Sequence, residues 1–310
     1  MSLEKSTLGR TDLEVTRLGY GAMELAGIKG PVDPADAHKL LNQVLDSGIT
    51  FIDTSPDYGA SEELIGEAIA SRRDEYVLAS KCGCPVTIPF ELANGRPVHL
   101  FTEENVRAAV EQSLRRMRTD RLDLVQVHMS PPRAEMERDG VIGTLEQLQR
   151  EGKLRYIGMS GILPDLADHI EMGCFDAFQI PYSALEREHE QAISQAAGAG
   201  AGTIIRGGVA RGAPAPDQSP DDVVGFWRDA MVKKRNIWEE AKLDELLATG
   251  MTQMDFMLRF TLSHPDVHTI IVGTSKAAHL ENNLRAARAG ALADDVYREA
   301  LVRLDALRGA

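Results

Sequence analysis

Four polar side chains in the N-terminal half of the chain are of types that together can move a proton. They are Asp53, Tyr58, Lys81 and His128. A phenol has an ordinary pKa near ~10, and a neighbouring ammonium is expected to lower that pKa by favouring the phenolate. A carboxylate can hold the ammonium in place, and an imidazole N–H can hydrogen-bond a carbonyl whose oxygen gains negative charge. The set predicts an acid–base site with Tyr58 as the proton donor, and it requires no nucleophile and no metal.

Each of these residues, taken singly, has an ordinary structural explanation. An Asp after a strand is usually a turn or helix cap, and a Lys, Tyr or His there is usually solvated or hydrogen-bonded. Their shared position favours function: Asp53 and Tyr58 follow one predicted strand, Lys81 ends the next, and His128 follows a third. In barrel enzymes the carboxyl ends of the strands form the rim that holds the catalytic residues.

Short apolar or β-branched runs, typical of buried parallel strands, alternate along the chain with segments of helical spacing. The runs are Leu18–Gly21, Ile49–Ile52, Tyr76–Ala79, Leu122–Val127, Tyr156–Met159, Ala177–Ile180, Thr203–Ile205 and Thr269–Val272. Eight strands, each followed by a helix, predict the α/β class and a closed (β/α)8 TIM barrel. A doubly wound sheet is disfavoured because no Gly-x-Gly-x-x-Gly follows the first strand. We expect residues 1–310 to form one domain.

Three further segments are expected around the barrel. Leu3–Leu8 and Leu13–Thr16 predict an N-terminal β-hairpin across the barrel floor. Long connections follow the third strand, over Cys82–Phe101, and the seventh, from Gly207 to about Val223. Because both leave the carboxyl ends of strands, we expect them to shape the substrate and cofactor sites, although tolerated surface insertions are the alternative.

Composition excludes several classes of protein. The net charge of −13 argues against nucleic acid or an anionic membrane as the main partner. No run of 18 apolar residues predicts a transmembrane helix, and Met1–Asp12 does not read as a secretory signal. Three cysteines, an odd and small number, point to a reducing compartment, and we expect a cytoplasmic protein. The sequence leaves open whether it is a monomer or a homo-oligomer.

Ordered motifs along nearly the whole chain resemble the aldo-keto reductase family. They are Leu45–Thr54 continuing through Tyr58-Gly59, Ser113–Met117 with Asp123–His128, and Arg150–Ser160. The resemblance implies a TIM barrel, an NADP(H) cofactor that delivers hydride, and a Tyr acid supported by Asp, Lys and His. By motif these roles fall on Tyr58, Asp53, Lys81 and His128. A small carbonyl or alcohol compound is then the expected substrate.

The resemblance also implies the residues that bind the cofactor. Those at the nicotinamide end are Gly21, Met23, Ser160, Gln179, Arg206 and Gly207, and those at the phosphate and adenine end are Gly273, Ser275, Lys276, His279, Asn282 and Asn283. Gly161 stands where the family has an Asn, so one hydrogen bond to the carboxamide is expected to be missing or replaced. A Gly-containing strand end that leads into a helix N-terminus is also a general anion site. NADP(H) is therefore expected, with NAD(H) left open because His279 and Asn282 depart from the common residues.

Other readings stay open at this stage. The same barrel could serve as a nicotinamide-binding regulatory or redox-sensing subunit with little turnover. A metal-dependent lyase or hydrolase is disfavoured, since the eight histidines show no His-x-His or His-Glu-x-x-His pattern. Cys82-Gly83-Cys84 has no second pair and no His close by in the chain, so no metal is expected. The substrate itself is not readable; its specificity is expected to lie in 85–101, 207–222 and Met129–Pro132.

Overall fold

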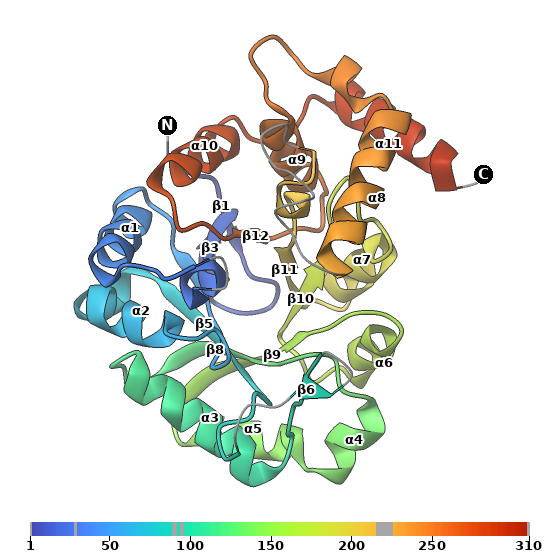
Figure 1. Ribbon diagram of the computed structural model, residues 1–310. Coiled ribbons are helices and arrows are strands. Elements are labelled where there is room, and N and C mark those ends of the chain that lie inside the picture. Colours follow the sequence, from blue (N-terminus) through green and yellow to red (C-terminus); the bar gives the residue numbers. More distant parts are fainter. Residues whose placement is uncertain (1, 28–29, 89–91, 94–95, 215–225, 309–310) are drawn as a thin grey trace.

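A computed structural model shows a closed barrel of eight parallel strands with helices around it (Figure 1), and it describes residues 2–27, 30–88, 92–93, 96–214 and 226–308. The strands are β3 (Leu18–Gly21), β4 (Phe51–Asp53), β5 (Val77–Cys82), β8 (Leu122–Val127), β9 (Leu154–Ser160), β10 (Ala177–Pro181), β11 (Gly202–Arg206) and β12 (Thr269–Val272). Each pairs with the next along the chain, and β12 closes the barrel on β3. The predicted TIM barrel is confirmed.

The described helices surround the barrel. This is expected because the strands of a parallel sheet are apolar on both faces, and the helices cover the outer one. They are α1 (Pro34–Asp46), α2 (Ser61–Ile69), α3 (Glu103–Arg116), α4 (Arg133–Arg138), α5 (Val141–Arg150), α6 (Asp165–Met172), α7 (Glu190–Gly198), α8 (Phe226–Glu240), α9 (Gln253–Leu262), α10 (Ala277–Arg288) and α11 (Asp294–Arg308). Asp33 caps α1 through two backbone N–H groups, and Pro34 is its first residue. The sequence argument did not single out α8 and α11, which pack against each other outside the ring.

The strands β3, β8 and β12 have the predicted bounds, and the bounds of the other five differ from the predicted ones by up to three residues at an end. The second barrel strand is β4, Phe51–Asp53, where Ile49–Ile52 was predicted, and β5 continues to Cys82. Apolar runs mark where a chain is buried, whereas a strand extends only as far as its neighbour offers hydrogen-bond partners. The difference favours the site, because Asp53 and Lys81 lie within paired strands and are held rigidly.

The N-terminal hairpin closes the barrel floor, as predicted. Its strands are β1 (Lys5–Thr7) and β2 (Glu14–Thr16), which pair in antiparallel register. Leu8, Leu13 and Val15 enter one apolar cluster with side chains from inside the barrel: Phe51, Ala79, Leu124, Ala177 and Ile204. The hairpin thus fills the end of the barrel opposite the predicted catalytic rim.

Leu8→Ala is expected to lower the free energy of unfolding by about 2–5 kcal/mol. The side chain is fully buried in the floor cluster, so truncation removes apolar contacts and leaves a cavity. Urea unfolding measures the loss. Val302→Ala is the control, because Val302 on α11 is 64% exposed and its truncation should change stability by less than about 0.5 kcal/mol. Equal effects of the two substitutions would contradict a packed floor.

The two long connections leave the same end of the barrel. The one after β5 contains a two-stranded sheet of β6 (Leu92–Ala93) and β7 (Arg96–Pro97). The one after β11 contains a short 3₁₀ turn, Ala210–Gly212, and the part of the predicted loop from residue 215 to about 223 lies outside the described residues.

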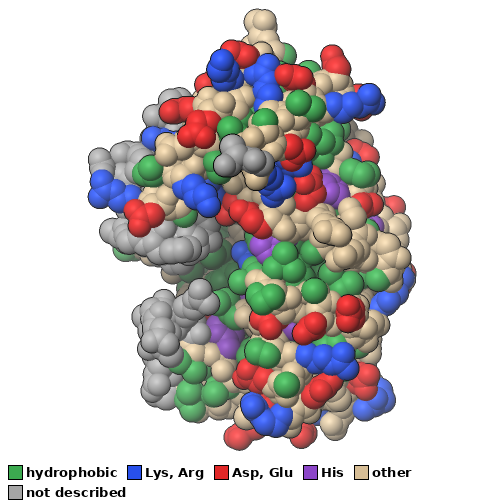
Figure 2. Space-filling view, turned by 90° about the vertical axis from the view of Figure 1, so that its right-hand side faces the viewer, with side chains coloured by type: hydrophobic (Ala, Val, Ile, Leu, Met, Phe, Trp, Pro, Cys, Tyr) green, Lys and Arg blue, Asp and Glu red, His purple; other side chains and the backbone are tan. Residues whose placement is uncertain are grey.

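The molecular surface carries intermixed charges and one marked indentation. In Figure 2 acidic and basic side chains are intermixed in the upper and lower parts of the face, and hydrophobic and His side chains are visible beside a hollow at the left. Within the described part of the chain, none of the helices has both the length and the apolar character needed to cross a membrane.

Candidate active site

The four predicted catalytic residues lie on three neighbouring barrel strands. Asp53 ends β4, Lys81 lies on β5, and His128 directly follows β8, while Tyr58 lies in the loop after β4. The parallel register pairs Asp53 with Ala79 and Lys81 with Gln126, which brings the carboxyl ends of the three strands level. The structure therefore brings together on one rim all four residues that the sequence argument selected.

Lys81 and Asp53 form a buried ion pair at the centre of this rim. Lys81 Nζ donates to Asp53 Oδ2 at 2.7 Å and to the carbonyl oxygen of Thr54 at 2.7 Å. Both side chains are at most 2% exposed. Burial alone would lower the pKa of Lys81, but Asp53 and Tyr58 outweigh it and raise the pKa above its ordinary value. The ammonium is therefore a permanent positive charge within the rim.

Two glutamines orient the carboxylate of Asp53. Gln126 Nε2 and Gln179 Nε2 both donate to Asp53 Oδ1, at 2.7 and 2.8 Å. Ser160 Oγ in turn donates to Gln179 Oε1 at 3.3 Å. Since Oδ2 takes the ammonium, the carboxylate has charge-assisted hydrogen bonds on both oxygens. Of the two residues predicted to hold the cofactor, Gln179 is thus linked directly to the Asp53 carboxylate, and Ser160 is linked to it through Gln179.

Tyr58 is half-buried against Lys81. The ammonium lies 4.9 Å from the centre of the phenol ring, a cation–π distance. From the residue types alone, Lys81 was expected to lower the pKa of Tyr58. In the structure, loss of hydration on burial outweighs the ammonium, so the pKa of Tyr58 is raised above its ordinary value. A raised pKa keeps the phenol protonated at neutral pH, as a proton donor requires.

His128 meets Tyr58 edge-on, with the ring centres 6.3 Å apart. Burial first, and then electrostatic interactions with Lys81, His99 and Arg206, hold the pKa of His128 well below its ordinary value. The imidazole is therefore neutral at pH 7, with one N–H donor and one acceptor nitrogen. Its Nδ1 atom lies 3.3 Å from Cys84 Sγ and 3.2 Å from His99 Nε2.

The predicted cofactor residues occupy the other half of the same rim, on five consecutive strands or the segments after them. Gly21 and Met23 end and follow β3, Ser160 ends β9, Gln179 lies on β10, Arg206 and Gly207 end and follow β11, and Gly273 follows β12. Gly273 lies against Gly21, since a Cβ on Gly273 would be only 2.9 Å from the Gly21 carbonyl oxygen. The sequence-selected residues thus form one continuous arc around the barrel mouth.

The N-terminus of α10 carries the remaining predicted residues. Ser275 and Lys276 precede the helix and are exposed, and His279, Asn282 and Asn283 lie on it. No side chain caps the first turn, which leaves helix N–H groups and the positive end of the helix dipole open to an anion. Asn282 is hydrogen-bonded to Arg285 at 2.9 Å.

Comparison with known proteins decides the family. The profile of the Aldo/keto reductase family matches residues 17–300, which include the whole barrel. The chain belongs to the aldo/keto reductase family.

Relatives within this family include proteins of known activity and structure. An L-galactose dehydrogenase of Arabidopsis thaliana is 26% identical over 296 residues, covering 92% of this chain and 88% of the relative. An NADH-specific methylglyoxal reductase of Escherichia coli (strain K12) is 30% identical over 205 residues, 62% of each chain. The holo form of aldo-keto reductase AKR11C1 from Bacillus halodurans superposes with a TM-score of 0.81, at 27% identity, covering 97% and 96% of the two chains.

An aldo/keto reductase is an oxidoreductase that uses a nicotinamide cofactor on small carbonyl compounds, so this chain is an enzyme of that general type.

Several residues of its rim were not predicted from the sequence. Gln126 had a usable signal, because it lies two residues before His128 on a strand and shares its face. Asp57 and His99 had none, since only the fold brings them to Cys84 and His128.

Proposed function

We propose that this aldo/keto reductase reduces an aldehyde, ketone or sugar carbonyl to the alcohol with NADPH as the hydride donor. The observation that carries the proposal is the buried Lys81–Asp53 pair, whose ammonium lies against the ring of the half-buried phenol Tyr58. Tyr58 is the general acid, Lys81 and Asp53 set its electrostatic environment, and His128 positions the carbonyl.

The chain's own residues supply the proton and the orientation. Tyr58, kept protonated by its raised pKa, donates its proton to the carbonyl oxygen as that oxygen becomes negative. The Lys81 ammonium then stabilises the phenolate that remains, and Asp53 holds the ammonium in place. The neutral imidazole of His128 donates a hydrogen bond to the same oxygen. A bound nicotinamide would supply the two electrons and the hydrogen that reach the carbonyl carbon.

The arc from β9 round to β3 suits a phosphorylated nicotinamide cofactor. Ser160 and Gln179 offer hydroxyl and amide groups for a carboxamide, and the planar guanidinium of Arg206 can stack on a ring. The uncapped N-terminus of α10, with Ser275 and Lys276 beside it, suits a phosphate group. NADPH is proposed over NADH because the Lys276 ammonium can pair with the additional phosphate group. A relative in Escherichia coli is nevertheless NADH-specific by name.

NADPH oxidation against a panel of aldehydes, ketones and sugars tests the function. We expect turnover of at least one aldehyde, with methylglyoxal and an aldohexose included in the panel. The alternative, a regulatory or redox-sensing subunit, would instead give tight cofactor binding, negligible turnover throughout the panel and recovery of a stable partner by pull-down. Nothing in the described structure favours that outcome over the enzyme.

Lys276→Ala is expected to raise KM for NADPH by a factor of roughly 10 to 150 and to leave KM for NADH unchanged. Removing one charge-assisted contact to a phosphate costs about 1.5–3 kcal/mol, and 1.4 kcal/mol corresponds to a factor of ten. Initial rates with each cofactor measure the effect. Lys5→Ala removes the same charge at the barrel floor and should alter neither constant. An equal rise in both KM values would argue against a 2′-phosphate contact at Lys276.

A further inference from the structure

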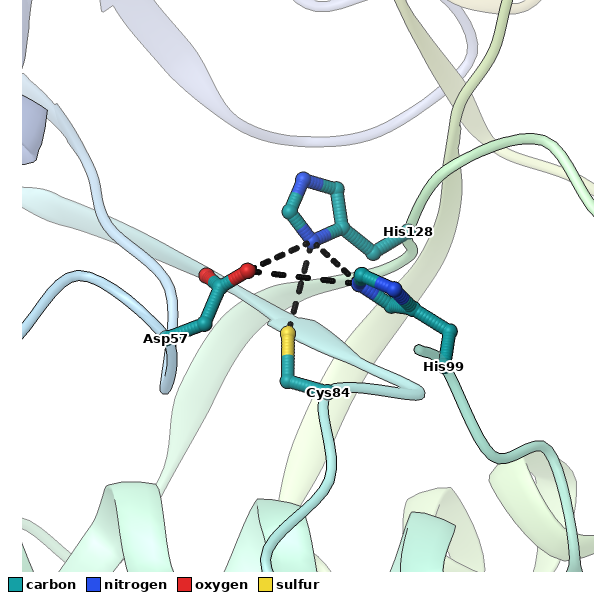
Figure 3. A group of neighbouring side chains, drawn as sticks. All are labelled: Asp57, Cys84, His99 and His128. Carbon is teal, nitrogen blue, oxygen red and sulfur yellow. Dashed lines mark hydrogen bonds and ion pairs between the residues drawn. The ribbon is translucent and has the colours of Figure 1, made fainter. Parts of the chain in front are cut away.

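Four side chains with metal-binding groups converge beside the proposed acid–base site, on loops that follow three different strands (Figure 3). Asp57 comes from the loop after β4, Cys84 and His99 from the two limbs of the long loop after β5, and His128 from the end of β8. One ligand atom of each lies within 4.8 Å of the other three. We propose that this four-ligand cluster is a zinc site that ties the three loops together and fixes the imidazole of His128.

Four of the six distances between the ligand atoms lie close to those of a zinc coordination shell, and all six are within 4.8 Å. A tetrahedral ion with Zn–N near ~2.05 Å and Zn–S near ~2.3 Å sets N···N edges at ~3.3 Å and S···N edges at ~3.6 Å. Here His99 Nε2 and His128 Nδ1 are 3.2 Å apart, and Cys84 Sγ lies 3.3 Å from His128 Nδ1. Asp57 Oδ2 lies 3.7 and 4.0 Å from the two imidazole nitrogens, slightly wider than the ideal edge.

Hydrogen bonding alone does not explain this convergence. An imidazole nitrogen has either one proton or one lone pair, so it makes one well-directed hydrogen bond. Three polar side chains nevertheless point at His128 Nδ1, and in Figure 3 the dashed lines from Asp57, Cys84 and His99 meet at that atom. The carboxylate distances also exceed the range of a direct hydrogen bond. A cation between the four groups satisfies all of them at once.

The cluster is buried and held in place by its surroundings. Cys84 is 1% exposed, and the side chains of Asp57, His99 and His128 are at most 10% exposed. Gly83 has a φ of +92°, and a Cβ there would strike the ring of Phe101, which stacks on His99 with centres 6.2 Å apart. Only glycine at this turn allows the two limbs to approach so closely.

Asn105, near the start of α3, clamps the two limbs of the loop. Its amide nitrogen donates to the carbonyl oxygens of Cys84 and Leu100, both at 2.9 Å, and its side-chain oxygen accepts the Val86 N–H at 3.0 Å. The Leu100 N–H also donates to Gly83 O at 2.8 Å. Cys84 and His99 are therefore presented by a rigid frame, as a pre-organised metal site requires.

The donor set selects zinc by its chemistry. Thiolate and imidazole ligands favour zinc over magnesium or calcium, which prefer oxygen ligands. One thiolate and one carboxylate balance the two positive charges of the ion. Asp57 Oδ1 accepts a hydrogen bond from Ser55 Oγ, the kind of outer contact that orients a ligating carboxylate.

A zinc ion on Nδ1 has a direct consequence for the imidazole of His128. The other ring nitrogen, Nε2, points away from the three partner side chains (Figure 3). Metal ligation at Nδ1 places the remaining proton on Nε2 and fixes the ring, so His128 becomes a positioned N–H donor. The site goes beyond the proposed reduction, since its binding of zinc needs neither cofactor nor carbonyl.

Metal analysis of the full-length protein, made without a His tag and loaded with zinc sulfate before dialysis, tests the site. We expect about one zinc ion per chain in wild type and in Cys82→Ala, and less than about a fifth in Cys84→Ala and His99→Ala. Cys82 is the matched control, a buried thiol two residues away that lies outside the cluster. Adding zinc to the metal-free wild type should raise Tm by roughly 3–6 °C, and Cys84→Ala should show no shift.

Cobalt substitution identifies the ligands. Cobalt-loaded wild type should show tetrahedral d–d bands and a thiolate charge-transfer band, and Cys84→Ala should lose the charge-transfer band. Wild type that retains less than a tenth of an equivalent of zinc, or a Cys84→Ala protein that retains a full one, would overturn the proposal. These measurements are made without cofactor. Zinc binding without carbonyl reduction would therefore count only against the proposed function, and carbonyl reduction without zinc binding would count only against the zinc site.

Discussion

Replacing Tyr58 by Phe is expected to lower kcat for carbonyl reduction by roughly 10²- to 10⁴-fold, the usual contribution of a positioned general acid. The substitution removes the hydroxyl that is proposed to donate the proton and keeps the ring against Lys81. Cofactor affinity should stay within about twofold, because the predicted cofactor residues lie on the other half of the rim. Steady-state rates with NADPH, together with cofactor titration by protein fluorescence, separate the two effects.

Tyr76→Phe is the matched control for this experiment. Tyr76 is buried just before β5, and its hydroxyl has no hydrogen-bond partner among the described residues. Loss of that hydroxyl should change neither kcat nor stability by a measurable amount. Full activity of Tyr58→Phe would show that Tyr58 is not the general acid and that another group on the rim donates the proton.

Lys81→Met is expected to lower the free energy of unfolding by about 3–5 kcal/mol and also to reduce kcat at least a hundredfold. The substitution leaves the carboxylate of Asp53, 2% exposed, without its counter-charge, and the Thr54 carbonyl without its donor. Gln126 and Gln179 still donate to one oxygen of Asp53, but neutral amides cannot balance a buried charge. Urea unfolding and steady-state rates measure the two losses.

Two further variants separate the ion pair from other effects of the change. Asp53→Asn combined with Lys81→Met removes both charges, so it should recover much of the lost stability while activity stays low. Lys5→Met breaks an exposed pair, Lys5 with Glu14, whose 2.6 Å contact is at least as short but whose side chains are 50% and 63% exposed. That change should cost less than about 1 kcal/mol. A similar cost for Lys5 and Lys81 would contradict the argument from burial.

The amino-acid sequence by itself predicted the barrel, which the structure confirms, and the residues proposed to be catalytic. Strand and helix periodicities are local properties, and eight alternations leave few architectures that bury all the apolar faces. The end of a parallel strand is also a local feature, so the placement of Asp53, Lys81 and His128 on one rim followed from the barrel alone. Asp53 and Tyr58 lie within six residues of each other, which let a single motif carry both.

Only the tertiary structure decided how these groups behave. The sequence argument gave Lys81 the larger influence on the pKa of Tyr58, but burial has the larger influence, and burial is set by the packing of the whole rim. The helix α8 was missed because it is an additional helix between β11 and β12, and α11 was missed because it follows the last strand–helix repeat. Gln126 acquired its role only once β8 was paired level with β5.

The four-ligand cluster is the clearest case of a feature that the chain order conceals. In the sequence no His lies close to Cys82-Gly83-Cys84, and the absence of a metal motif led to the expectation that no metal binds there. In the fold, His99 lies near Cys84 on the second limb of the same loop, and His128 lies beside both at the end of β8, the next strand of the barrel. Sequence spacing reports contacts within a helix or a strand, whereas contacts between loops depend on turns, on one clamping side chain and on the closure of the barrel.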